Sequence, residues 1–138
     1  NSSAAVERGG ESISVIGVRD PAFTAGRASS TVGSALASLT GGDGYKILLS
    51  HRPELVDIYR GSGFDLVVSG HAHGGQVRIP GLVNGLFAPC QGWFPQYAGG
   101  AYALGSTTLV VSRGLCRNEL PRVFNRPELV IVILSPET

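Results

Sequence analysis

The first half of the chain alternates short apolar runs with amphipathic stretches. Branched apolar residues followed by turn residues predict strands at 12–18, 45–51 and 64–70. Apolar residues at helical spacing predict helices between these strands, at 30–42 and 52–63. Such a strand–helix alternation is typical of helices packed on a largely parallel sheet, so the pattern predicts an α/β fold.

Each predicted helix has its own start and stop signals. The first places four apolar residues on one face and is followed by Gly41 as a stop. The second begins near Pro53, which suits the first helical position, and ends at Gly61 or Gly63. The apolar face of the first helix consists of Val32, Ala35, Leu36 and Leu39.

The second half, residues 71–138, is predicted to be mainly β. Its strand-like segments follow one another without intervening helices, which favours antiparallel pairing. The irregular residues 81–100 between them are predicted to form a long loop that covers a site. The four strand-like segments are 76–81, 100–105, 107–114 and 127–134.

Length and charge narrow the possible classes of protein. The 138 residues, 43% of them hydrophobic, suit one compact domain, and the net charge of +1 gives no case for a nucleic-acid partner. No apolar run is long enough to predict a transmembrane segment. Because the chain begins at Asn1 and contains no Met, we expect an N-terminal portion to be absent. Cys90 and Cys116 lack the spacing of a metal motif, and their redox state stays open.

All three histidines fall at the ends of predicted strands. His51 ends the strand 45–51, and His71 and His73 follow the strand 64–70. Ligands bind at the carboxyl ends of strands in open parallel sheets, so His51 and His71 are expected to lie close together. Two histidines one residue apart in extended chain point to the same side and suit two metals about 3.5–4 Å apart. Hydrogen-bonded surface histidines, in a loop without a ligand, are the alternative.

Several stretches resemble the C-terminal half of a calcineurin-like metallophosphoesterase of the bacterial, often membrane-associated kind. They are ILLSHRPELVD, FDLVVSGHAHGGQVRIPG, VVSRGL and PRVFNRPELVIVIL, of which SGHAHGGQ is the most specific. The resemblance implies a four-layer α-β-β-α sandwich, mixed sheets with helices outside. It also implies hydrolysis of a phosphoester by two divalent ions, manganese, iron or zinc, bridged by a hydroxide. Residues 1–138 then form half of one domain, 12–70 being its alternating part.

The resemblance also implies metal ligands. His51 and His71 would bind the second metal, and His73 would bind the first. The upstream family motifs D-x-H, G-D-x-x-D and G-N-H-D/E do not occur, and GGDGYK has Lys46 where a carboxylate is needed. Three neutral imidazoles cancel none of the charge of two dications, so we expect weak or single metal binding and little activity from this chain alone. Strand edges left without partners predict self-association or binding of the missing half.

Other residues carry open alternatives. A non-catalytic module that uses the histidines for one structural metal or for partner binding is the alternative function, and no residue is assigned as catalytic. Three arginines either contact a substrate phosphate or are solvated or paired with carboxylates, and Asp20 is explained by a turn. The aromatic residues of the long loop form a lid, a lipid-contacting patch or, as the simplest interpretation, packing. The arginines are Arg78, Arg113 and Arg122; the aromatic residues are Phe87, Trp93, Phe94 and Tyr97.

Overall fold

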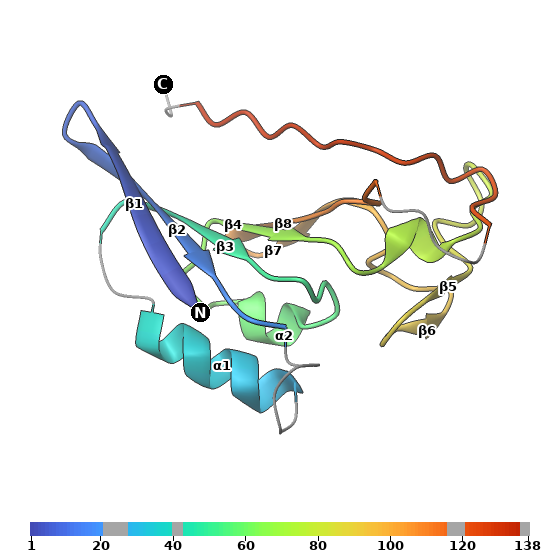
Figure 1. Ribbon diagram of the computed structural model, residues 1–138, viewed down its shortest axis with the longest axis horizontal. Helices are drawn as coiled ribbons and strands as arrows, with labels where there is room; N and C mark the ends of the chain where they lie inside the picture. Colours follow the sequence, from blue (N-terminus) through green and yellow to red (C-terminus); the bar gives the residue numbers. More distant parts are fainter. Residues whose placement is uncertain (21–27, 40–42, 116–120, 136–138) are drawn as a thin grey trace.

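A six-stranded mixed sheet forms the centre of the computed structural model, which describes residues 1–20, 28–39, 43–115 and 121–135 (Figure 1). Its strand order is β1-β2-β3-β4-β8-β7, in which the four central strands are parallel and the two edge strands pair antiparallel with their neighbours. The central strands are β2 (Glu11–Gly17), β3 (Tyr45–Leu49), β4 (Leu66–Ser69) and β8 (Thr107–Val111), and the edges are β1 (Ser2–Arg8) and β7 (Gly100–Leu104).

The α/β class predicted from the alternation is confirmed, whereas β1 was not foreseen. The predicted strands 12–18, 45–51 and 64–70 correspond to β2, β3 and β4. The segment SSAAVER of β1 is exposed throughout and lacks an apolar alternation. It becomes a strand because a turn at Gly9 and Gly10, both with positive φ, folds it back onto β2.

Both predicted helices exist, but the second is much shorter than expected. Helix α1 (Ala28–Leu39) buries Val32 and Leu36, and its predicted stop at Gly41 lies outside the described residues. Helix α2 covers only Val56–Tyr59 and ends just before Gly61, whose φ is 72°. The segment 52–55 is not helical and forms a turn before α2, in which Arg52 and Glu54 pair with each other.

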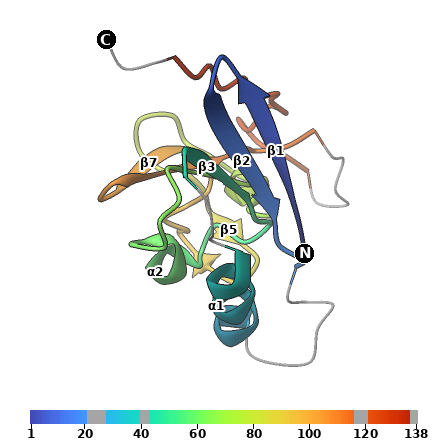
Figure 2. The same ribbon diagram turned by 90° about the vertical axis from the view of Figure 1, so that its left-hand side faces the viewer.

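The core lies between the sheet and the two helices. One row of side chains crosses the four parallel strands in register and is at most 1% exposed. Helices α1 and α2 cover this face of the sheet, contributing Val32, Leu36 and Tyr59 to the same cluster (Figure 2). The row consists of Ile16, Leu48, Val67 and Leu109.

The opposite face of the sheet is also apolar. In register with one another lie Val15, Ile47 and Leu66, and farther along the strands Leu49 and Val68. Leu49 is 45% exposed although Leu48, its neighbour on the other face, is fully buried. Strands that are apolar on both faces are typical of sheets covered by a layer on each side. The second face therefore has the composition of a buried surface.

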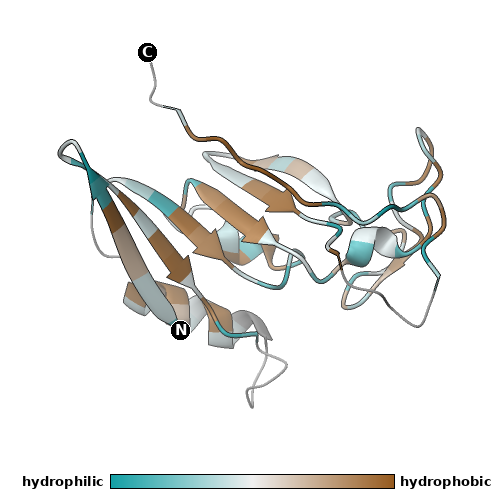
Figure 3. Cartoon of the chain, turned by 45° about the horizontal axis from the view of Figure 1, so that its top comes forward, coloured by the Kyte–Doolittle hydropathy of each residue, from teal (hydrophilic) through white to brown (hydrophobic). Residues whose placement is uncertain are grey.

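The last apolar segment, Glu128–Leu134, runs along this second face without forming a strand (Figures 1 and 3). The prediction of a strand at 127–134 was therefore wrong within the described residues, because no neighbouring strand lies beside it. Leu129, Ile131 and Ile133 are 76%, 78% and 85% exposed. Between the end of this segment and the start of β2 and β3 lies a cavity of about 840 Å³.

The rest of the second half departs partly from its prediction. Strands β7 and β8 form the expected antiparallel hairpin, but β8 also pairs parallel with β4, and 76–81 makes only isolated bridges. Within 81–100, β5 (Phe87–Ala88) and β6 (Gly92–Trp93) form a small hairpin. Trp93 and Phe94 are 68% and 67% exposed and lie outside the core, although the Trp93 ring packs edge-on against Phe87 within the loop. Tyr97 does pack, with its ring edge against Tyr102.

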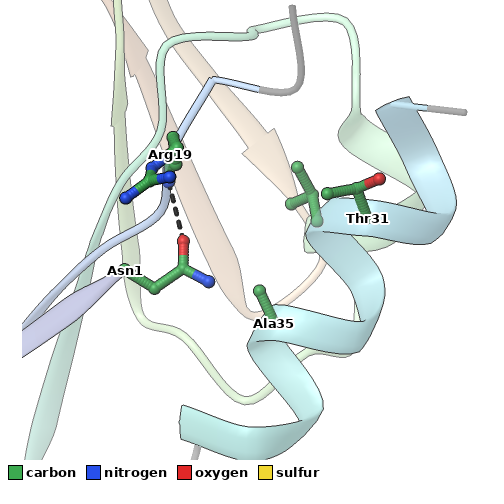
Figure 4. Close-up of a pocket in the computed structure, with 5 residues that line it drawn as sticks. Asn1, Arg19, Thr31 and Ala35 are labelled. Carbon is green, nitrogen blue, oxygen red and sulfur yellow. Dashed lines mark hydrogen bonds between the residues drawn. The ribbon is translucent and has the colours of Figure 1, made fainter. Parts of the chain in front are cut away.

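The N-terminus lies close to α1. Asn1 accepts a hydrogen bond from the Arg19 backbone amide (2.8 Å) through its side-chain oxygen, and the two residues line a small hollow with Thr31, Val32 and Ala35 (Figure 4). This hollow is lined by none of the histidines. Among the described residues, no helix is long and apolar enough to cross a membrane.

Glu128 fixes the start of the C-terminal apolar segment. Its carboxylate accepts hydrogen bonds from the Arg113 guanidinium (2.5 Å) and from the Arg113 backbone amide (3.0 Å). Arg113 thus has the carboxylate partner that was its alternative assignment. The Arg113 side chain lowers the pKa of Glu128 from its usual value of 4.5.

Glu128→Gln is therefore expected to remove a pH-dependent contribution to stability. Because the pKa of Glu128 is lower in the folded state, its ion pair stabilises the fold above pH 4.5, and this contribution is lost as pH falls through the folded pKa. Urea unfolding measured as a function of pH should show a smaller acid-side decline for Glu128→Gln than for the unchanged chain. The exposed Glu7→Gln is the matched control, and identical pH profiles for all three proteins would contradict the expectation.

Candidate metal centre

Three neighbouring parallel strands end at the candidate site. Asp20 follows β2, His51 follows β3 and His71 follows β4, each two or three residues after the strand. Pairing continues beyond the strands, because Val18 donates to the Leu49 carbonyl and Ser50 donates to the Val68 carbonyl, both at 3.1 Å. The carboxyl edge of the sheet thus sets the three side chains next to one another.

The hydroxyl group of Tyr59 in α2 anchors the loop that carries His51. The buried Tyr59 hydroxyl donates to the Arg52 carbonyl (2.5 Å) and lies 2.7 Å from the Ser50 hydroxyl. Burial raises the pKa of Tyr59, so this hydroxyl keeps its proton and remains a donor. His51 itself is directed outward, with half of its side chain exposed.

The sequence SGHAHGGQ suggested an extended chain at the two histidines, but the loop after β4 is not extended. His71, His73 and Gln76 have φ values of 63°, 48° and 59°, which are uncommon for residues with a side chain. His73–Gly75 forms a single 3-10 turn, η2. Such strained backbone persists only where surrounding structure enforces it, and it gathers at functional sites.

Asn125 holds η2 in this conformation. Its buried side-chain amide donates to the His73 carbonyl (2.7 Å) and to the Gln76 carbonyl (3.1 Å). The two glycines of the loop have no room for a side chain: a Cβ at Gly74 would overlap the Asn125 amide, and one at Gly75 would overlap the backbone of Gly85. The glycines therefore allow close packing beneath the histidines.

His51, His71 and Asp20 form a compact group. His71 Nδ1 lies 3.0 Å from His51 Nε2, and His51 Nε2 lies 3.7 Å from an Asp20 carboxylate oxygen. One ligand atom from each of the three residues lies within 4.8 Å of the other two. Arg52 Nε donates to the other Asp20 oxygen at 2.9 Å and so orients the carboxylate. The predicted proximity of His51 and His71 is confirmed.

His73 lies outside both groups of potential metal ligands found among the described residues. It is partly buried, and burial together with the charges of Arg122 and His51 lowers its pKa below the usual 6.5. Burial, with the neighbouring charges of His51 and Arg52, also lowers the pKa of His71. Both imidazoles are therefore neutral at pH 7, the form in which histidine binds a metal.

A divalent ion fits the donor set at this edge. Two imidazoles and a carboxylate are ligands that zinc, iron and manganese accept, and Asp20 supplies negative charge that the histidines lack. His71 Nδ1, the nitrogen that faces His51, is the atom of His71 that would bind this ion. The residues present are therefore compatible with a metal.

Three residues of this region were missed by sequence reasoning. Asp20 was explained by a turn, and no role at the site was predicted for Glu54 or Cys90, yet both lie beside His71. Asp20 was detectable from the sequence because it follows a parallel strand, which is the signal that identified the histidines. Cys90 was not, because it comes from the β5–β6 turn, far from the histidines in sequence. Cys90 forms no disulfide among the described residues, and Cys116 lies outside them.

Comparisons with known proteins identify relatives that are named phosphodiesterase or metallophosphoesterase. The chain is 34% identical over 89 residues to phosphodiesterase YaeI of Escherichia coli, covering 64% of this chain and 32% of that protein. It is 35% identical over 92 residues to the uncharacterized metallophosphoesterase YkuE of Bacillus subtilis, covering 66% of this chain and 31% of that protein. The uncharacterized metallophosphoesterase Cj0846 of Campylobacter jejuni is 42% identical over 91 residues, covering 64% of this chain and 22% of that protein.

These matches confirm the resemblance to the metallophosphoesterases. The chain is related to the metallophosphoesterases over about two thirds of its length, and it corresponds to part of their domain. It spans about a third or less of the length of the curated relatives it matches. No family model matches the chain, and no solved structure matches it.

Proposed function

We propose that residues 1–138 provide the histidine half of the active site of a binuclear, metal-dependent phosphoester hydrolase of the calcineurin-like kind. The observation that carries the proposal is the 3.0 Å approach of His71 Nδ1 to His51 Nε2 beside Asp20, at the carboxyl edge of the sheet. The relatives named phosphodiesterase and metallophosphoesterase support this class of reaction.

Each residue of the edge has a role in this proposal. His51 and His71 bind one ion, and Asp20, oriented by Arg52, adds a carboxylate to the same position. His73 binds the other ion together with residues supplied by the rest of the parent protein. When bound, manganese, iron or zinc ions polarise phosphoryl oxygens and promote the ionisation of water, the chemistry that phosphoester hydrolysis needs. Because Arg52 is paired with Asp20 and Glu54, the positive charge that attracts a phosphate anion would come from the bound ions.

The second, apolar face of the sheet supports the four-layer architecture. We propose that in the parent protein this face packs against a second sheet, with residues 128–134 lying between the two layers. Leu49 and the exposed Ile131 and Ile133 would then be buried between the sheets. In the absence of that layer, residues 1–138 are expected to self-associate through the same surfaces. A single monomeric species in sedimentation at high concentration would argue against this arrangement.

A mononuclear, non-catalytic site is the second candidate function. It is favoured by the Asp20–His51–His71 group, which offers three ligand atoms without any residue from outside the chain. Three ligands suffice for one ion, but the two neutral imidazoles and one carboxylate do not balance two dications.

Metal content and turnover distinguish the two functions. We expect residues 1–138 alone to bind at most one ion weakly and to hydrolyse a chromogenic phosphodiester with added Mn²⁺ hardly above background. The full-length parent is expected to contain two ions per chain by elemental analysis and to turn the same substrate over. One ion or none in an inactive full-length protein would favour the mononuclear function, and robust turnover by residues 1–138 would show that the site is not divided.

A further inference from the structure

Three segments bring a second set of metal-ligating side chains together on the far side of His71. Glu54 comes from the loop before α2, His71 from the loop after β4, and Cys90 from the turn of the β5–β6 hairpin. One ligand atom from each lies within 4.8 Å of the other two. A carboxylate oxygen, an imidazole nitrogen and a thiol sulfur together are a ligand set suited to zinc.

Two atoms of this cluster are buried without a partner. Glu54 Oε2 and His71 Nε2 are inaccessible to solvent and make no hydrogen bond in the described part of the structure. Leaving a buried polar atom unpaired costs about 1–3 kcal/mol, so both atoms would gain from a ligand placed between them. A cation satisfies an imidazole nitrogen and a carboxylate oxygen at the same time.

Arg52 organises the cluster without occupying these two atoms. Its Nη1 lies 2.6 Å from Cys90 Sγ and 3.4 Å from Glu54 Oε1, while its Nε is engaged by Asp20. The second oxygen of Glu54 is therefore left for another partner. Binding of a divalent ion would release the proton of the Cys90 thiol. The positive charges of the ion and Arg52 would then face two negative groups, the Glu54 carboxylate and the Cys90 thiolate.

We propose that Glu54, His71 and Cys90 form a binding site for a thiophilic divalent ion, of which Zn²⁺ is the type. Mn²⁺ and Mg²⁺ prefer oxygen ligands and are not expected to bind there. His71 belongs both to this cluster and to the Asp20–His51–His71 group. Zn²⁺ bound at Cys90 should therefore compete with a metal ion bound at His51. This competition rests on the proposed function, whereas binding of Zn²⁺ at Cys90 does not.

Protection of the Cys90 thiol tests the proposal without measuring hydrolysis. In the full chain carrying Cys116→Ser, Cys90 is the single thiol, and its reaction with 5,5′-dithiobis(2-nitrobenzoate) is followed with and without added metal. We expect Zn²⁺ to slow the reaction and the same concentration of Mn²⁺ to leave it unchanged. Loss of an outer-shell partner already costs about 10–100-fold in metal affinity, so Glu54→Gln should raise the protecting Zn²⁺ concentration at least about tenfold. His71→Ala should do the same.

His51→Ala is the matched control, because His51 touches His71 but is not a member of the cluster. It should retain Zn²⁺ protection of Cys90. Absence of protection in the Cys116→Ser protein, equal protection in Glu54→Gln and His71→Ala, or equal loss in His51→Ala would each overturn the proposal. Circular dichroism identifies any variant that fails to fold. In that event the test is the near-ultraviolet thiolate-to-metal charge-transfer band of the Co²⁺-loaded Cys116→Ser protein, whose absence would likewise overturn it.

Discussion

Replacing His71 by alanine is expected to abolish the phosphoester hydrolysis that we propose for the full-length parent protein. His71 is the residue of the site that is both partly buried and in contact with His51, and its pKa is lowered, which keeps it neutral for metal binding. The loss in kcat/KM should exceed the about 10–100-fold that removal of an outer-shell partner costs. Steady-state kinetics on a chromogenic phosphodiester, together with elemental analysis of bound metal, measure the effect.

Asp57→Asn is the control for this substitution, because Asp57 is exposed on α2 and belongs to neither group of ligand atoms. It should leave turnover and metal content as they are. If His71→Ala kept both its metal and its activity, the proposed site would be wrong. If it lost activity while keeping two ions, His71 would act on the substrate and not as a ligand.

Leu48→Ala and Leu49→Ala are expected to destabilise residues 1–138 to very different extents. Leu48 is fully buried against the helices, and its truncation should cost about 2–5 kcal/mol of unfolding free energy. Leu49 lies on the second face of the sheet and is 45% exposed, so its truncation should cost less than about 1 kcal/mol. The two residues are adjacent in the same strand, which makes each the control for the other.

The same pair tests whether a second layer covers the sheet in the parent protein. If it does, Leu49 becomes a core residue there, and Leu49→Ala should cost as much as Leu48→Ala. Urea unfolding of both variants in both proteins gives the four free energies needed. A small effect of Leu49→Ala in the parent protein as well would mean that this face stays open, contrary to the four-layer arrangement.

Much of the sheet could be foreseen because local patterns control it. The apolar runs of β3 and β4 are nearly continuous, as expected in strands with two apolar faces. Strand β2 alternates serine with branched apolar residues and ends at Gly17. The segment of β1 was missed because nothing apolar distinguishes it, and its pairing depends on a turn and on β2. The segment 127–134 was predicted as a strand on its composition, but a strand also requires a neighbour.

The candidate site likewise has residues that the sequence predicts and residues that it does not. Its histidines were predictable because the carboxyl edge of a parallel sheet collects whatever follows each strand, and this rule depends on the order of elements alone. Glu54 and Cys90 join the site through contacts between segments distant in sequence, and no local pattern announces such contacts.

The sequence by itself determined the α/β class, the positions of the central strands and the proximity of His51 and His71, since hydrophobic periodicity and strand ends are local properties. Only the tertiary structure decided that Asp20 faces His51, that Cys90 reaches Arg52, and that His71 and His73 adopt positive φ. Those features depend on how loops pack on one another: Asn125, 52 residues after His73, holds the histidine loop in place. Packing between distant segments is a global property, which a reading along the chain does not contain.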